Sequence, residues 1–185
     1  MTLVLGITGP NAAGKGEVSG ILAARGFATH SLSDVVREEA AALGLPPERE
    51  HLIRVGTSLR REGGAGVLAQ RILPRLGGRD VVDSIRNPAE VDVLRSLAGF
   101  VLVGVTAPAE LRFERSRRRA RAGDPETFAE FLARERQENS TDPAGQQLAA
   151  TFALADRVLV NDGNLDALRT RVDDLLAALS DGTRG

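Results

Sequence analysis

The sequence has 185 residues, a length typical of one domain with a sizeable core. Its 24 Lys and Arg residues nearly balance its 25 Asp and Glu residues, and the net charge of −1 argues against a general attraction to nucleic acid or an anionic membrane. Cysteine is absent and only His30 and His51 carry imidazole, which excludes disulfides, thiolate metal sites and an imidazole-rich metal centre.

The first apolar run lacks a basic flank and passes directly into a glycine-rich loop, which is not typical of a signal peptide. No apolar segment approaches the roughly 20 residues that a membrane-spanning helix needs. We therefore expect a cytoplasmic protein without a membrane partner.

Short apolar runs alternate with amphipathic stretches along the chain. The predicted strands are Leu3–Thr8, Phe27–His30, Asp80–Asp83, Phe100–Thr106 and Arg157–Val160. The predicted helices are Glu17–Ala24, Asp34–Leu43, Glu48–Arg61, Ala65–Leu76, Ala89–Leu97 and Asn164–Leu179. This alternation predicts an α/β fold in a single domain over residues 1–185, with a parallel sheet of about five strands covered by helices on both faces.

The first predicted strand is followed by GPNAAGKG, residues 9–16, which fits the G-x-x-x-x-G-K pattern of a phosphate-binding loop between a strand and a helix. In such a loop, backbone N–H groups and the positive end of the helix bind a polyphosphate. Lys15 is the only lysine, so 23 of the 24 basic residues are arginine. A compact ammonium suits the β and γ phosphates better than the larger planar fork of arginine. The alternative, a glycine-rich turn with an ordinary surface lysine, fits this context poorly. The predicted ATP-binding residues are Gly9, Asn11, Ala12, Ala13, Gly14, Lys15, Gly16 and Glu17.

The residues after Lys15 depart from the usual pattern. The Ser or Thr that commonly ligates Mg²⁺ is replaced by Gly16, and Glu17 follows it. A carboxylate beside phosphates is repelled unless Mg²⁺ or an arginine lies between them. Glu17 is therefore either a ligand in the metal shell or a favourable acidic residue in the first turn of a helix.

The stretch SLSDVVRE, residues 31–38, follows the second predicted strand at the edge of the sheet where open parallel sheets bind ligands. Arg37 lies one turn into the next helix, where its guanidinium is suited to bidentate binding of an acceptor phosphate. A solvated helix residue is the alternative. The predicted substrate-binding residues in this stretch are Ser33, Asp34 and Arg37.

The stretch VVDSIRNPAEV, residues 81–91, ends a hydrophobic strand in Asp83, a position suited to holding Mg²⁺ or its waters. Arg86 follows three residues later and is the fourth predicted substrate-binding residue. Ser84 replaces the glutamate that activates water in many motor ATPases, and no N/T-K-x-D element for guanine recognition occurs. These features argue against a motor ATPase and a GTPase switch.

The stretch LRFERSRRRARAGD, residues 111–124, is rich in arginine and opens a charged segment, residues 117–144, that we predict to be a small helical lid. A kinase needs cations that close over the site after the substrates have bound, where they screen the transferring phosphoryl group and exclude water. An exposed face or a nucleic-acid patch is the alternative. We expect Lys15, Asp83, Arg115 and Arg119 to be the catalytic residues.

The loop after the last strand admits two interpretations. The backbone of residues 161–163, with Gly163 as a predicted ATP-binding residue, is placed to contact adenine. The segment is equally suited to a simple strand-to-helix turn with Asn164 as the N-cap.

Together these motifs resemble the nucleoside monophosphate kinases and dephospho-CoA kinases of the P-loop superfamily, over nearly the whole chain. GPNAAGKG matches their phosphate loop. SLSDVVRE resembles the S-T-G-D-x-x-R segment of adenylate kinases, with Arg37 at the phosphate-binding arginine. VVDSIRNPAEV resembles the D-G-x-x-R segment, with Arg86 one position closer to Asp83. ADRVLVNDGNLDALR is similar to the end of dephospho-CoA kinases, and the overall likeness is greatest to an archaeal, dephospho-CoA-kinase-like group.

The resemblance implies a three-layer P-loop NTPase fold and a kinase that uses ATP and Mg²⁺. Dephospho-CoA kinases supply a carboxylate base from a D-A-D-x-x-x-R segment, whose aspartates are Ser31 and Ser33 here. A monophosphate acceptor needs no base. We therefore expect a nucleotide-like small-molecule acceptor and favour a nucleoside monophosphate, with dephospho-CoA as the alternative. We expect no nucleic-acid partner; the rival from another class is a non-catalytic regulator that binds RNA through its arginine run.

Overall fold

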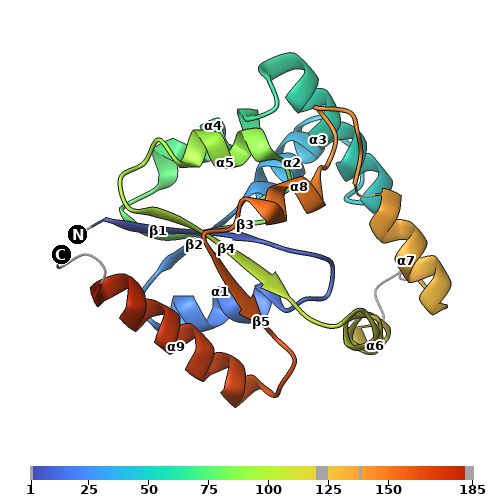
Figure 1. Ribbon diagram of the computed structural model, residues 1–185. Helices are drawn as coiled ribbons and strands as arrows, with labels where there is room; N and C mark the ends of the chain where they lie inside the picture. Colours follow the sequence, from blue (N-terminus) through green and yellow to red (C-terminus); the bar gives the residue numbers. More distant parts are fainter. Residues whose placement is uncertain (1, 120–124, 138, 182–185) are drawn as a thin grey trace.

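The computed structural model describes residues 2–119, 125–137 and 139–181. Five strands form one parallel sheet, which confirms the predicted α/β fold (Figure 1). The strands are β1 (Leu3–Thr8), β2 (Ala28–Ser31), β3 (Arg79–Asp83), β4 (Phe100–Thr106) and β5 (Arg157–Val160), in the order β2-β3-β1-β4-β5. Because β1 lies at the centre, the loops that follow β1, β3 and β4 meet at the carboxyl edge of the sheet, where such sheets bind ligands.

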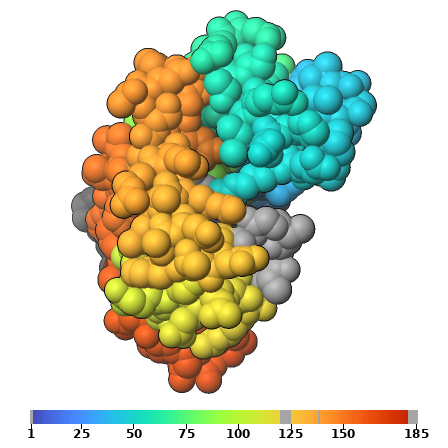
Figure 2. Space-filling model, turned by 90° about the vertical axis from the view of Figure 1, so that its right-hand side faces the viewer, coloured from blue at the N-terminus to red at the C-terminus, as the bar shows by residue number. Residues whose placement is uncertain are grey.

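Helices cover both faces of the sheet and give three layers (Figure 1). On one face lie α1 (Lys15–Ala24) and α9 (Leu165–Asp181). On the other lie α2 (Leu32–Ala42), α4 (Val67–Ile72), α5 (Pro88–Leu94) and α8 (Leu148–Ala153). Beyond the carboxyl edge of the sheet lie α3 (Arg49–Gly63), α6 (Ala109–Arg119) and α7 (Phe128–Gln137). Figure 2 views the molecule from that edge, where α3 in teal and α7 in orange lie next to each other and the surface dips between them.

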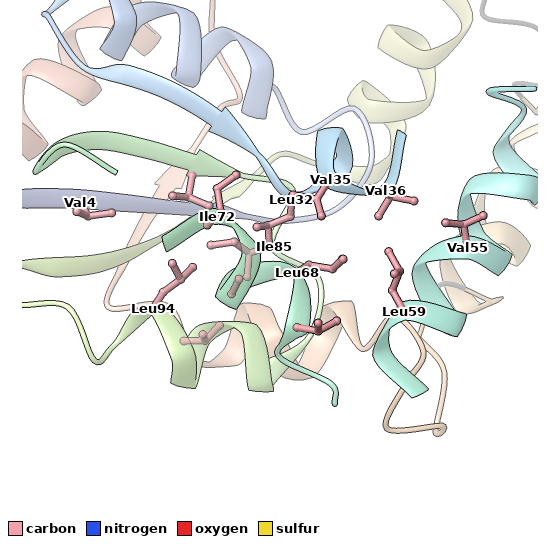
Figure 3. Close-up of a cluster of buried hydrophobic side chains, with 14 of the residues drawn as sticks. Val4, Leu32, Val35, Val36, Val55, Leu59, Leu68, Ile72, Ile85 and Leu94 are labelled. Carbon is pink, nitrogen blue, oxygen red and sulfur yellow. The ribbon is translucent and has the colours of Figure 1, made fainter. Parts of the chain in front are cut away.

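Two hydrophobic clusters hold the layers together, one on each face of the sheet. Val4 belongs to the cluster under α2, α4 and α5 (Figure 3). Its neighbour Leu5 belongs to the other cluster, under α1 and α9. Both side chains are at most 1% exposed. A sheet covered on both faces needs apolar residues in succession, and each fully buried one contributes about 1.5–3 kcal/mol. The apolar runs in the sequence reflect this double burial.

The elements differ from the predicted ones in a few places. The helix predicted for residues 65–76 ends at Ile72 and continues as the short 3₁₀ helix η1 (Leu73–Arg75), because Pro74 has no N–H to donate to the α-helical ladder. The sequence did not predict α8. No helix of the described residues is long and apolar enough to cross a membrane.

Helices α6 and α7 share a small apolar cluster. The ring of Phe113 on α6 lies 5.6 Å from that of Phe128 and 5.8 Å from that of Phe131, both on α7. These contacts pack α6 against α7. The predicted lid boundary at residue 117 falls inside the last turn of α6, which begins at Ala109.

Candidate functional site

The phosphate loop connects β1 to α1 in a backbone conformation that requires glycine. Gly9 has φ 138° and Gly14 has φ 100°, both in the region that L side chains rarely adopt. A Cβ atom on Gly9 would lie 2.0 Å from the carbonyl oxygen of Val105 on β4. No described residue accepts a hydrogen bond from the backbone N–H of Asn11, Ala12 or Gly14. These N–H groups are available to an anion, as a phosphate loop requires.

The predicted catalytic lysine lies over this loop. Lys15 is the first residue of α1, and its Nζ donates hydrogen bonds of 2.8 Å to the carbonyl oxygens of Gly9 and Pro10. The side chain therefore turns back from the helix across the loop. The ammonium therefore contacts the same loop whose N–H groups are available to an anion.

The two residues after Lys15 lie in the first turn of α1. A Cβ atom on Gly16 would meet nothing within 4 Å, so this position is open. Glu17 is exposed, and its Oε2 lies 3.5 Å from the place of a Cβ atom on Gly14. Its carboxylate thus turns toward the loop, where the positive end of the helix favours it.

Asp83 ends β3 and faces the end of β2, where Ser31 is its register partner. Its Oδ1 accepts hydrogen bonds from the hydroxyls of Ser31 at 2.8 Å and Ser84 at 2.5 Å. Ser31 Oγ also accepts from the N–H of Ser33 and so caps α2. In the part of the chain that the structure describes, no side chain or N–H bonds the other oxygen, Oδ2. The site therefore presents one carboxylate oxygen among hydroxyls.

The predicted acceptor residues of α2 form an exposed ion pair. Arg37 Nη1 donates a 2.6 Å hydrogen bond to Asp34 Oδ1, and the two side chains are 53% and 57% exposed. A pair in such solvent contact contributes about 0–1 kcal/mol. Asp34 therefore holds Arg37 too weakly to prevent it from binding an incoming phosphate.

Arg86, the other predicted acceptor residue, lies in the loop between β3 and α5. Its Nη1 donates a 2.9 Å hydrogen bond to Oε1 of Gln146, and its carbonyl accepts one of 2.8 Å from the N–H of Gln147. Its own N–H donates to Oε2 of Glu90 at 2.9 Å. The backbone of Arg86 is thus anchored on two sides, and residues 146–147 lie beside its guanidinium.

The buried group that supports this loop was not predicted from the sequence. Glu90 is fully buried and accepts four hydrogen bonds, two from the guanidinium of Arg60 on α3 and one each from the N–H groups of Arg86 and Asn87. Asn87 also donates to the carbonyls of Pro143 and Gly145. The network joins α3, the Arg86 loop and the segment that follows α7. Its signal was present as N-P-A-E, because Asn at the N-cap and Glu at N3 form a capping box.

A second link between α3 and this segment lies at the surface, where Arg61 pairs with Asp142 at 2.8 Å. The N–H of Ala144 and then the guanidinium of Arg61 hold the pKa of Asp142 below its ordinary value. The carboxylate therefore stays ionised and paired at neutral pH, which helps to dock the segment on α3.

Arginines of α6 face the phosphate loop. Arg112 is 7% exposed and donates to the carbonyl oxygens of Ala107 and Asn11, while both oxygens of Glu135 on α7 accept from it. Arg119 Nη1 lies 3.5 Å from Asn11 Oδ1, a long contact at the limit of a hydrogen bond. The predicted catalytic residue Arg119 therefore lies beside the loop. Residues 120–124 of the predicted arginine-rich stretch, with Arg121 among them, lie outside the described residues.

The other predicted catalytic arginine meets the loop after β5. Arg115 Nη2 lies 3.5 Å from Asn161 Oδ1, and Asn161 Nδ2 donates a 2.9 Å hydrogen bond to the carbonyl of Ala13 in the phosphate loop. Asn164 caps α9 by accepting from the N–H of Ala167 at 2.9 Å, which confirms the strand-to-helix turn. A contact of Gly163 with adenine stays a prediction.

Comparison with known proteins bears on the family and the fold of the chain. Residues 5–142 match the family model described as an AAA domain. The chain is 37% identical over 182 residues to a UPF0200 protein of Hyperthermus butylicus, covering 96% of this chain and 95% of the relative. It is 30% identical over 186 residues to the UPF0200 protein PH1008 of Pyrococcus horikoshii, covering 96% and 97%.

Among solved structures, TT1252 from Thermus thermophilus is 26% identical with a TM-score of 0.60, covering 96% of this chain and 98% of that one. Shikimate kinase from Acinetobacter baumannii is 16% identical with a TM-score of 0.62, covering 98% and 95%. The latter likeness shows the fold alone. The chain thus has the three-layer fold of P-loop NTPases, with kinases among its structural neighbours. The narrower likeness to dephospho-CoA kinases stays a prediction.

Proposed function

The chain belongs to the UPF0200 family, and we propose that it is an ATP- and Mg²⁺-dependent phosphotransferase of the kinase type. The observation that carries the proposal is the contact of α6 arginines with the predicted phosphate loop: Arg119 lies against Asn11 of the loop, and Arg115 lies against Asn161, which is hydrogen-bonded to the loop. Phosphoryl transfer depends almost entirely on positioning and on cations around the transferring group. Loop amides on one side and arginines on the other meet that need.

The donor would bind along the loop. The N–H groups of Asn11, Ala12 and Gly14 and the ammonium of Lys15 are the groups we assign to the β and γ phosphates of ATP. Lys15 must then exchange the carbonyls that it contacts for phosphate oxygens. The stronger charge-assisted bond to an anion favours that exchange.

The donor set at Asp83 fits Mg²⁺. This ion takes oxygen ligands and binds through one or two carboxylates together with substrate phosphates and several waters. Asp83 offers one carboxylate beside the Ser31 and Ser84 hydroxyls, and its Oδ2 accepts no hydrogen bond from the described residues. Glu17 is the second candidate ligand for the coordination shell of Mg²⁺. When bound, Mg²⁺ neutralises charge that develops on the phosphates.

For the acceptor we favour a nucleoside monophosphate. Arg37 and Arg86 follow β2 and β3, which are neighbouring strands, so both side chains start from the same edge of the sheet. The side chain that faces Asp83 from β2 is the hydroxyl of Ser31, where a hydroxyl acceptor would profit from a carboxylate base. Asp34, the next carboxylate along the chain, is exposed and paired with Arg37. A monophosphate is already an anion and uses the two arginines directly.

A screen for acceptor-dependent ADP formation tests the proposal. The purified protein is incubated with ATP and Mg²⁺ together with each nucleoside monophosphate or dephospho-CoA, and Lys15→Ala is the control. We expect one monophosphate to raise ADP release to a kcat on the order of 1–100 s⁻¹, the range of kinases. Turnover with dephospho-CoA alone would show that dephospho-CoA, and not a nucleoside monophosphate, is the acceptor. No turnover with any acceptor, combined with tight and salt-dependent RNA binding, would replace the kinase by a nucleotide-binding regulator.

A further inference from the structure

Asn161 lies where three parts of the site meet. It directly follows β5, it is 6% exposed, and its backbone N–H donates a 2.7 Å hydrogen bond to the carbonyl of Thr106 at the end of β4. Its side chain reaches the phosphate loop through Nδ2, which donates to Ala13, and reaches α6 through Oδ1, which Arg115 approaches. One amide therefore contacts both the loop and a predicted catalytic arginine.

The side chain of Asn161 packs closely on the loop. A Cβ atom on Gly14 would lie 2.1 Å from Asn161 Nδ2, so the amide packs directly on the backbone that precedes Lys15. Gly14 is thus required by its φ angle and also by the neighbouring amide. This packing and the bond to Ala13 hold Asn161 and the loop in one arrangement.

The same two contacts determine which way the amide faces. The carbonyl of Ala13 only accepts hydrogen bonds, so Nδ2 must face it and Oδ1 must face α6. The side chain of Arg115 carries donors only, and Oδ1 is the acceptor that it needs. The 3.5 Å separation is long, as is usual for catalytic contacts that tighten when substrate binds.

Arg112 and Arg115 lie on the same helix, one turn apart, but their surroundings differ. Arg112 is bound by both oxygens of the Glu135 carboxylate, so its charge is neutralised and its role is structural. Arg115 Nη1, by contrast, is buried without a hydrogen-bond partner among the described residues, and its partner at Nη2 is the neutral amide of Asn161. A buried donor left unpaired is costly and calls for an explanation. An anionic oxygen of the donor nucleotide would satisfy it.

We propose that Asn161 is a positioning residue that aims Arg115 at the terminal phosphate of the nucleotide held by the phosphate loop. Nδ2 ties the amide to the loop, and Oδ1 orients Arg115 without neutralising its charge. The guanidinium of Arg115 and the loop therefore bind the same phosphate. This inference rests on the proposed phosphotransferase function and adds to it the residue that couples α6 to the loop.

Four proteins form a double-mutant cycle: the wild type, Asn161→Ala, Arg115→Ala and the double variant. Calorimetry measures the affinity of each for ADP and for a non-hydrolysable ATP analogue that carries the γ-phosphate. We expect each single variant to lose about 10-fold or more in affinity for the analogue relative to ADP, the effect of one charge-assisted contact. The double variant should lose no more than Arg115→Ala alone, because both changes remove the same contact. Independent, multiplying losses would overturn the proposal.

Two further variants keep the test decisive. Asn161→Asp keeps the size of the side chain but places a carboxylate beside Arg115; kcat/KM for ATP should fall at least 10-fold while the KM for the acceptor changes little. Asn164→Ala, in the same loop, removes only the cap of α9. It should lower the melting temperature and leave kcat/KM for ATP unchanged. An equal loss of kcat/KM for ATP in both variants would show that Asn161 acts only by holding the loop, and would overturn the proposal.

The binding cycle needs no acceptor and therefore separates this inference from the proposed function. If no acceptor supports turnover, the phosphotransferase proposal fails, while coupling between Asn161 and Arg115 in analogue binding still supports the positioning role. If turnover is found and the losses in analogue affinity multiply independently, only the role of Asn161 is lost. If Asn161→Ala does not fold, Asn161→Ser takes its place in the cycle, with the same expected coupling.

Discussion

The buried pair of Arg60 and Glu90 allows a stability effect to be worked out from the structure. Their side chains are 5% and 0% exposed, and Glu90 Oε1 accepts from Arg60 at 3.0 and 2.7 Å. In Glu90→Gln, one amide oxygen is able to replace Oε2 as the acceptor for the N–H groups of Arg86 and Asn87. The amide nitrogen then faces the donors of Arg60. The guanidinium is left buried without a counter-charge, which costs about 3–5 kcal/mol.

For a chain of this length, we expect this loss to lower the melting temperature by about 6–20 °C, at roughly 2–4 °C per kcal/mol. Unfolding is best followed by circular dichroism, because the chain has no Trp or Tyr to provide a fluorescence signal. The matched control is Glu39→Gln, which breaks an exposed pair with Arg71 whose side chains are 33% and 44% exposed. That change should cost about 0–1 kcal/mol.

A second variant checks the cause. Arg60→Met combined with Glu90→Gln removes the unpaired guanidinium and should recover part of the lost stability, since replacing both partners is less costly than removing one. The reasoning is refuted if Glu90→Gln is no more destabilising than Glu39→Gln. It is also refuted if the double variant is less stable than Glu90→Gln alone.

Three further predictions concern turnover. Lys15→Arg should lose on the order of 10²-fold in kcat, nearly as much as Lys15→Ala, because a planar guanidinium does not fit the place of the ammonium; retention of half the wild-type kcat would contradict the argument from size. Asp83→Asn should abolish the dependence of the rate on Mg²⁺ concentration while leaving the melting temperature unchanged, and an unaltered Mg²⁺ response would move the metal role to Glu17. Arg37→Ala should lower kcat/KM for the acceptor by roughly 10- to 150-fold with little change in ATP affinity or stability. Near-complete inactivity of Asp34→Asn, with normal folding and substrate binding, would instead favour a hydroxyl acceptor and dephospho-CoA.

The local features of the site were visible in the sequence. Gly9 and Gly14 are needed for backbone angles set within the loop itself, and the apolar run before them predicts the strand that delivers the loop. Asp83 ends an apolar run, Ser31 follows the second predicted strand, and the carboxyl ends of parallel strands share one edge. The sequence therefore placed both residues at that edge, and the register of β2 against β3 brings them into contact.

The roles of the arginines were decided by the tertiary structure. Arg112 and Arg115 occur in the same run on the same helix, and nothing local distinguishes them. Their partners are 23 and 46 residues away, Glu135 on α7 and Asn161 after β5. Whether an arginine pairs with a carboxylate or with an amide depends on which distant elements pack together. Hydrophobic periodicity and secondary-structure propensity carry no information about that packing. By itself the sequence predicted the glycine loop that we assign to phosphates, because glycine conformations and strand ends are local properties. The tertiary structure alone decided which arginines pair with a carboxylate inside the protein and which do not, because charge pairing is a property of the packed chain.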